Sequence, residues 1–298
     1  MESPAEPTYA RMRVAPEELD LAHTLTPGQS FRWRSDDLGR WTGVVGRKVV
    51  RIWREGPDLL FEMFPGPPDE RVIRDYFRLE VSLADVLAGF PDDEHLSRAA
   101  SRFPGLRVLR QDPEETLLSY ACSPANSVRR IVTSIEEMCR RHGDLISVLD
   151  GREWYSFPTA ERLLCAGPGD LAGPCGLCFR GRKLCSAAGR IVERPKGWAA
   201  SLRSASYDDA RAELIRIEGI GPKIADCALL FSLDKDEACP ADTHIRQVAA
   251  RHYGLDLPQK SFTPRVYQQI VDFFQSRFGA YAGWAQEYLF YDDLLGRR

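Results

Sequence analysis

A lysine and an aspartate with side chains suited to covalent chemistry lie nineteen residues apart, at positions 223 and 242. Lys223 directly follows the glycine-rich segment Gly219-Ile220-Gly221-Pro222, and Asp242 follows Pro240. A lysine amine becomes a nucleophile when burial or a neighbouring cation lowers its pKa from the usual value of about 10.4. A surface lysine near a helix start is the alternative interpretation of Lys223.

Asp242 precedes the helical pattern of residues 243–253, where an aspartate is an ordinary helix N-cap. A capping role and a catalytic role are compatible. A capping carboxylate stays ionised, and an ionised carboxylate stabilises positive charge that develops beside it.

Two short helices joined by a tight hairpin are the elements that position Lys223. Apolar residues recur at helical spacing up to Ile217, the glycine-rich segment interrupts them, and Pro222 suits the first turn of a new helix. We expect Gly219 and Gly221 to take the positive φ of so tight a reversal and to leave backbone N–H groups open to an anion. A nucleic-acid phosphate is a natural ligand for such a loop.

These motifs resemble the helix-hairpin-helix DNA glycosylase superfamily, in which the lysine after the hairpin is the nucleophile of the bifunctional enzymes. More narrowly, the chain is similar to 8-oxoguanine DNA glycosylases, and the likeness extends from about Thr26 to Asp293. The sequence motifs that carry it are GPKIADC, SLDK, PADTH and GAYAGWAQEYLF.

The resemblance implies a base-excision-repair enzyme that removes 8-oxoguanine opposite cytosine from double-stranded DNA. It also implies AP lyase activity, β-elimination through a Schiff base on Lys223, with Asp242 as the second catalytic residue. A glycosylase of the same fold for another damaged base is an alternative, as is a helix-hairpin-helix protein that only binds DNA. The pair of Lys223 and Asp242 argues against a protein that only binds DNA, because binding alone requires neither residue.

The resemblance also assigns a base pocket to four residues. Gly28 corresponds to the glycine whose carbonyl accepts the N7 proton of 8-oxoguanine. Cys227, at i+4 from Lys223, corresponds to one side of the pocket, with Phe290 stacking on the other. Gln286 corresponds to the reader of the Watson–Crick edge. A buried thiol and a core aromatic are the alternative interpretations of Cys227 and Phe290.

Further residues match the DNA contacts of the family. Arg130 and Arg180 correspond to the arginines that bind the unpaired cytosine, Phe179 replaces a tyrosine wedge, and His244 corresponds to a phosphate contact. Where the family often has three asparagines, this chain has Ala125-Asn126-Ser127. The side chain that fills the space left in the base stack by the extruded base is therefore missing or shifted to Asn126. This puts selectivity for the base opposite the lesion in question.

Composition and charge are those of an ordinary globular protein: of 298 residues, 44% are hydrophobic and 28% charged, with a net charge of −3. A basic segment at residues 180–203 offers a face for DNA despite that net charge. Neither a membrane span nor an apolar signal core is expected. We expect a monomer that is not secreted, in the cytoplasm or nucleoid of a prokaryote or the nucleus of a eukaryote.

Eight cysteines raise the question of a metal site. The set Cys165, Cys175, Cys178 and Cys185 contains one C-x2-C pair, but two of its members look like helix-packing residues. The iron–sulfur cluster of some superfamily members needs cysteines beyond Cys239, and the chain has none there. We therefore expect neither a metal nor another cofactor.

The hydrophobic pattern predicts an α+β fold with a small N-terminal antiparallel β-sheet domain packed on a larger all-α body. Residues 1–17 are expected to be a flexible lead-in. Period-two runs end at Phe64, Asp69 is a candidate N-cap, and the rest of the chain reads as helical. We place the β-rich domain at 18–105 and the helical domain at 106–298.

Overall fold

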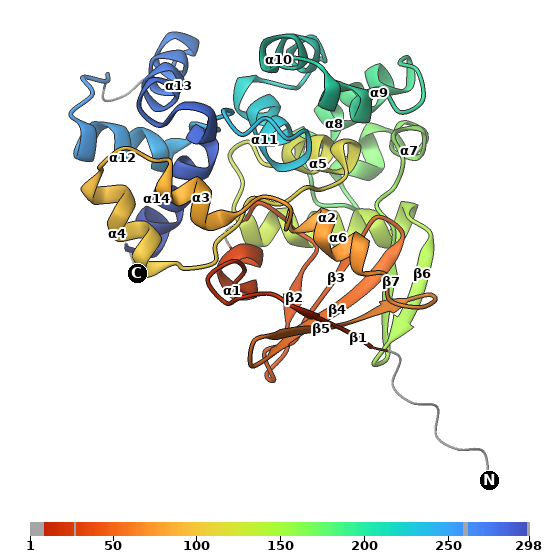
Figure 1. Cartoon of the computed structure of the whole chain (residues 1–298). Coiled ribbons are helices and arrows are strands. Elements are labelled where there is room, and N and C mark those ends of the chain that lie inside the picture. Colours follow the sequence, from red (N-terminus) through yellow and green to blue (C-terminus); the bar gives the residue numbers. More distant parts are fainter. Residues whose placement is uncertain (1–8, 27, 259–261, 297–298) are drawn as a thin grey trace.

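The computed structural model describes residues 9–26, 28–258 and 262–296. It has the predicted α+β architecture, a five-stranded antiparallel sheet beside a larger body of helices (Figure 1). Within these ranges, none of the helices has the length and apolar character needed to cross a membrane.

The sheet has the strand order β1-β5-β4-β3-β2. Its strands are β1 (Ala10–Arg13), β2 (Arg34–Ser35), β3 (Trp41–Val45), β4 (Lys48–Glu55) and β5 (Asp58–Phe64). The period-two runs therefore form antiparallel hairpins as predicted, with Trp41 opposite Ile52 and Val49 opposite Phe64. The expectation of a flexible lead-in is wrong for residues 10–13, because β1 pairs with β5 and Met12 is buried beneath the sheet. Residues 1–8 lie outside the described ranges.

Four short helices accompany the sheet: α1 (Leu21–Leu25), α2 (Glu70–Tyr76), α3 (Leu83–Ala88) and α4 (Glu94–Arg102). Asp69 caps α2 as predicted, and its side chain accepts from the N–H of Arg71. The core under the sheet reaches Leu109, whereas α3 and α4 pack into the cores of the helical body. The domain division at residue 105 stays a prediction.

The helical body consists of α5 (Pro113–Ala121), α6 (Val128–His142), α7 (Ala160–Ala172), α8 (Phe179–Val192), α9 (Trp198–Ser201), α10 (Tyr207–Ile215), α11 (Pro222–Ser232), α12 (Thr243–Tyr253), α13 (Pro264–Phe278) and α14 (Ala282–Gly296). Its residues form two buried hydrophobic clusters, one around α5, α8 and α11 and the other around α12, α13 and α14. The site described below lies between them.

The prediction that the chain is helical from Asp69 onward is wrong at one hairpin. Strands β6 (Leu145–Leu149) and β7 (Arg152–Tyr155) are joined at Asp150-Gly151, where both residues have positive φ. An Asp-Gly pair between apolar runs is a strong hairpin signal, so this element was visible in the sequence. Trp154 of β7 packs against valines of the main sheet.

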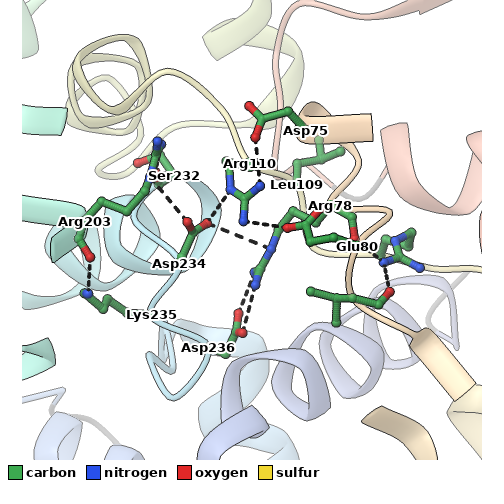
Figure 2. A network of polar contacts seen from close by, with 12 residues as sticks. Asp75, Arg78, Glu80, Leu109, Arg110, Arg203, Ser232, Asp234, Lys235 and Asp236 are labelled. Carbon is green, nitrogen blue, oxygen red and sulfur yellow. Dashed lines mark hydrogen bonds and ion pairs between the residues drawn. The ribbon is translucent and has the colours of Figure 1, made fainter. Parts of the chain in front are cut away.

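Ion pairs join the N-terminal part of the chain to the helical body (Figure 2). Arg78, which is buried, donates to both carboxylate oxygens of Asp236 at 2.5 and 2.9 Å. Arg110 donates from Nε to Asp234 at 2.8 Å. The motif Ser232-Leu233-Asp234-Lys235, one of those that carried the family resemblance, therefore serves to hold the fold together.

Candidate active site

The hairpin between α10 and α11 positions the predicted nucleophile. Ile217 and Ile220 are buried and fix the turn to the core. Gly219 has φ +91, and a Cβ there would lie 3.2 Å from the carbonyl oxygen of Lys183. Gly221 instead has φ −90 and ψ 174, which any residue adopts, so the expected positive φ is wrong for this glycine. A Cβ at Gly221 would meet nothing within 4 Å, which leaves the start of α11 open.

A cavity of about 760 Å³ opens beside this hairpin, between the two helical clusters. It brings together most of the predicted site residues from segments far apart in the sequence. These are Gly28, Asn126, Gly221, Lys223, Cys227, Asp242, His244, Gln286 and Phe290.

Lys223 is half-buried in the first turn of α11. Its Nζ lies 4.9 Å from the ring centroid of Tyr120, within range of a cation–π interaction. Cys227 is one helical turn further and 2% exposed. Burial raises the pKa of the Cys227 thiol to about 12, although the charge of Lys223 and a hydrogen bond from it act in the opposite direction. Cys227 is therefore a neutral thiol in the cavity wall.

Asp242 is the N-cap of α12, and its Oδ1 accepts from the backbone N–H groups of His244 and Ile245 at 2.8 and 3.0 Å. His244 is held in turn by Asp293, with 2.8 Å between Nδ1 and Oδ2. Its ring meets that of Phe290 edge to face at 5.4 Å. These contacts fix the start of α12 against α14.

Gly28 is held at the cavity by a buried glutamine that sequence reasoning did not single out. The Nε2 of Gln29 donates to the carbonyl oxygens of Thr24 and Arg107, and its Oε1 accepts from the N–H of Leu109. Gly28 has φ +93, so its position favours glycine on backbone grounds. Its carbonyl accepts from the Tyr120 hydroxyl at 3.0 Å, which leaves one lone pair for a ligand.

Helix α14 presents Gln286 and Phe290 to the cavity from successive turns. Gln286 is 3% exposed, and its Oε1 has no hydrogen-bond partner in the described structure. Phe290 is half-buried. A buried amide oxygen without a partner costs free energy unless a ligand supplies a donor.

The residues predicted to contact the opposite strand lie outside this cavity. Arg180 is 8% exposed, and its guanidinium donates to the carbonyl oxygens of Pro124, at 2.6 Å from Nε, and Ala125. Phe179 is 58% exposed, and its ring centroid lies 4.4 Å from the Arg180 guanidinium carbon. Arg130, which is exposed, lines a second cavity of about 940 Å³ between α6 and β7. In the free protein, Arg180 thus holds the loop before Asn126.

Besides Gln29, the cavity is lined by Tyr120 and Glu287, which sequence reasoning did not single out either. No sequence feature marks Tyr120 as a functional residue, because an aromatic residue in an apolar helix usually belongs to the core. Glu287 does have such a feature, since it is a charged residue in the middle of the mostly apolar segment Trp284–Phe290.

The four cysteines considered as a metal set do not come together as a ligand group among the described residues. There, the group with side chains close enough for a metal is His142, Asp170 and Cys175, whose ligand atoms lie within 4.8 Å of one another. Nε2 of His142 and Oδ2 of Asp170 already lie within hydrogen-bond distance of each other, at 2.6 Å.

Comparison with known proteins places this geometry in a family. The sequence model described as "8-oxoguanine DNA glycosylase, N-terminal domain" matches residues 11–117. The N-glycosylase/DNA lyase OGG1 of Arabidopsis thaliana is 32% identical over 98% of this chain and 82% of its own length. The chain belongs to the 8-oxoguanine DNA glycosylase family. It is a DNA N-glycosylase and DNA lyase of base excision repair, and DNA is its partner.

Solved structures agree with this glycosylase over nearly their whole length. MBOgg1, in complex with a low-affinity DNA ligand, superposes with a TM-score of 0.87 at 28% identity, covering 98% of both chains. The Clostridium acetobutylicum 8-oxoguanine glycosylase/lyase, bound to double-stranded DNA with cytosine opposite 8-oxoguanine, has a TM-score of 0.84 at 28% identity. That match covers 94% of this chain and 93% of the other.

Proposed function

We propose that this enzyme removes 8-oxoguanine opposite cytosine from duplex DNA, as a monomer, and cleaves the strand through a Schiff base between Lys223 and the sugar. The observation that carries the proposal is the cavity itself. It holds an amine, a carboxylate and a neutral apolar slot within one space. A base inside the duplex stack cannot reach such a cavity, so the nucleotide must rotate out of the helix.

In the proposed reaction, the neutral amine of Lys223 attacks C1′ and the damaged base leaves. Positive charge develops on the sugar as the glycosidic bond weakens. The Asp242 carboxylate, fixed at the start of α12, stabilises that charge. The aminal then opens to a Schiff base, from which the 3′ phosphate can be eliminated.

The base would lie between the Cys227 thiol and the Phe290 ring, two walls of the same cavity. The carbonyl of Gly28 would accept a hydrogen bond from the N7–H that 8-oxoguanine has and guanine lacks. Gln286, whose Oε1 lacks a partner, would read the Watson–Crick edge.

The test is single-turnover base release from duplexes that carry 8-oxoguanine, guanine or another damaged base at one position. We expect 8-oxoguanine opposite cytosine to react fastest. Faster release of a different damaged base would assign the cavity to that lesion instead.

We propose that the open start of α11 binds a DNA phosphate through backbone N–H groups. Gly221→Asp should weaken binding to lesion and undamaged duplexes alike, by about tenfold, because a carboxylate there takes the place of the phosphate. Gly221→Asn is the matched control, since aspartate and asparagine cap a helix equally well and the extended backbone accepts both. Titration of both duplexes with each variant measures the effect. A loss confined to lesion DNA would contradict the phosphate assignment.

Arg130 and Arg180 are proposed to recognise the unpaired cytosine, with Phe179 as the wedge and Asn126 and His244 as further DNA contacts. Arginine suits cytosine because its fork of donors matches the O2 and N3 acceptors. Arg180 has a second task, since it also holds the carbonyls of Pro124 and Ala125.

Ala125 has φ +50, a left-handed conformation that costs an alanine about 1–2 kcal/mol and that asparagine tolerates. Ala125→Asn should therefore raise the free energy of unfolding by about 1 kcal/mol. It should also sharpen the preference for cytosine over adenine opposite the lesion by about tenfold, since one good base contact is worth about 1–3 kcal/mol. Ala125→Gly is the control, because glycine relieves the backbone without supplying an amide. Equal selectivity in the two variants, measured on four duplexes that differ only in the opposite base, would contradict a base contact at this position.

A further inference from the structure

Glu287 is a buried carboxyl group at the reactive end of the cavity, and the mechanism above gives it no task. It lies in α14 between Gln286 and Phe290, lines the cavity and is 3% exposed. Its Oε1 has no hydrogen-bond partner in the described part of the chain. A carboxyl oxygen buried without a partner is costly, so its presence needs an explanation beyond packing.

The charged neighbours of Glu287 are the two residues proposed to act on the sugar of a bound nucleotide. The groups that act on its charge are Asp242 and Lys223, and Tyr120 interacts with it from α5. Lys223 must reach C1′, and Asp242 must lie close to the same carbon. Glu287 lines the same cavity, so the proposed position of the sugar between Lys223 and Asp242 would bring O4′ and C2′ close to its carboxyl group.

Burial and the negative charge of Asp242 raise the pKa of Glu287 to about 8, against the opposing effect of Lys223. The group is therefore an uncharged acid at neutral pH. A pKa near the working pH suits a residue that first gives and then takes a proton. Asp242 is fixed as the N-cap of α12, whereas Glu287 has an oxygen without a partner, so the two carboxyl groups are suited to different tasks.

We propose that Glu287 is the proton-transfer residue of the strand-cleavage step, donating a proton to O4′ and then accepting one from C2′. The proposal rests on the Schiff base at Lys223. When the C1′–O4′ bond breaks, its electron pair stays on O4′, which takes the Glu287 proton, and the C1′–nitrogen bond becomes the iminium. The Glu287 carboxylate then removes a C2′ proton. That electron pair forms the C2′–C3′ double bond, the C3′–oxygen bond breaks, and the phosphate leaves with its electrons. Glu287 ends as the acid with which it began.

Glu287→Gln keeps the shape of the side chain and removes its titration. On a duplex with a preformed abasic site, we expect strand cleavage to slow by about 100-fold in single turnover. Release of 8-oxoguanine should change by less than about threefold, because Lys223 and Asp242 are intact. Glu287→Asp keeps a carboxyl group and should recover part of the cleavage rate.

The pH profile separates proton transfer from a structural role. In the parent enzyme, strand cleavage should fall as the pH rises through about 8, where Glu287 loses its proton, and this limb should disappear in Glu287→Gln. Glu114→Gln is the matched control. Glu114 is another carboxyl group whose pKa burial raises, but it does not line the cavity, and its Oε1 accepts from the N–H of Ala160 at the start of α7. The Glu114→Gln variant should leave the pH profile of strand cleavage unchanged.

Thermal unfolding tests the protonation state without any DNA. A glutamic acid with a pKa of about 8 in the folded protein and about 4.5 in the unfolded chain stabilises the fold at low pH, and that stabilisation is lost as pH rises from about 4.5 to 8. The melting temperature of Glu287→Gln should therefore decline less over this range than that of the parent protein.

Three results would overturn the proposal. They are unchanged strand cleavage in Glu287→Gln, an equal loss of base release and strand cleavage in that variant, or melting temperatures of parent and variant that decline equally as the pH rises. These outcomes differ from failure of the Lys223 assignment. That failure would appear as covalent trapping that survives Lys223→Gln, whatever Glu287 does.

Discussion

Lys223→Gln is expected to eliminate strand cleavage and borohydride trapping, and to slow base release by at least about 1,000-fold. Glutamine is a polar side chain nearly as long as that of lysine, but it has no amine that can attack C1′, so the covalent route is closed. Binding of a lesion duplex should stay within about threefold, because the base slot and the hairpin phosphate site do not use the amine. Single-turnover rates and a gel assay of trapped complex measure the two effects.

Lys183→Gln is the matched control for this variant. Lys183 is exposed and its backbone lies against Gly219 of the hairpin, so the change removes a positive charge close by but outside the cavity. It should alter DNA affinity at most. Trapping that persists undiminished in Lys223→Gln would mean that another group is the nucleophile.

Asp242→Asn is expected to slow base release by about 100- to 1,000-fold, the usual effect of removing one group that stabilises charge in the transition state. The design separates two roles of one side chain. Asparagine caps a helix as well as aspartate does, so the bonds to the N–H groups of His244 and Ile245 can persist while the negative charge is lost.

Asp242→Ala removes the charge and the cap together. Its free energy of unfolding should be about 1 kcal/mol lower than that of Asp242→Asn. Base release should be as slow in Asp242→Ala as in Asp242→Asn. Base release by Asp242→Asn at the parental rate, alongside an unstable Asp242→Ala, would show that Asp242 is a cap and nothing more.

Much of the positioning of the site followed from local sequence. The two hairpin isoleucines, the proline at the first turn of α11 and the aspartate before α12 are short-range signals, and each of these elements forms where it was expected. The error at Gly221 has a physical reason. One glycine with positive φ, Gly219, is enough to reverse the chain, and Gly221 then starts the helix with extended backbone.

Long-range features could not be predicted from local signals. Strand β1 was hidden in a polar, proline-containing segment because it pairs with β5, some fifty residues away. The same holds for the Tyr120 hydroxyl on the carbonyl of Gly28 and for Arg180 on the loop at Ala125, since each contact joins separate elements. Only the fold brings such partners together. The hairpin at Asp150-Gly151 is different, because its signal, an Asp-Gly pair between apolar runs, is local.

The central claim is that the amine of Lys223 forms the Schiff base with DNA that carries 8-oxoguanine opposite cytosine. The most direct measurement is peptide mapping by mass spectrometry after borohydride reduction of the parent enzyme on that duplex. We expect one modified peptide, with the sugar fragment on Lys223, and little adduct on the matched guanine duplex. An adduct on a different lysine or on the N-terminal amine, or equal adduct on both duplexes, would contradict the account.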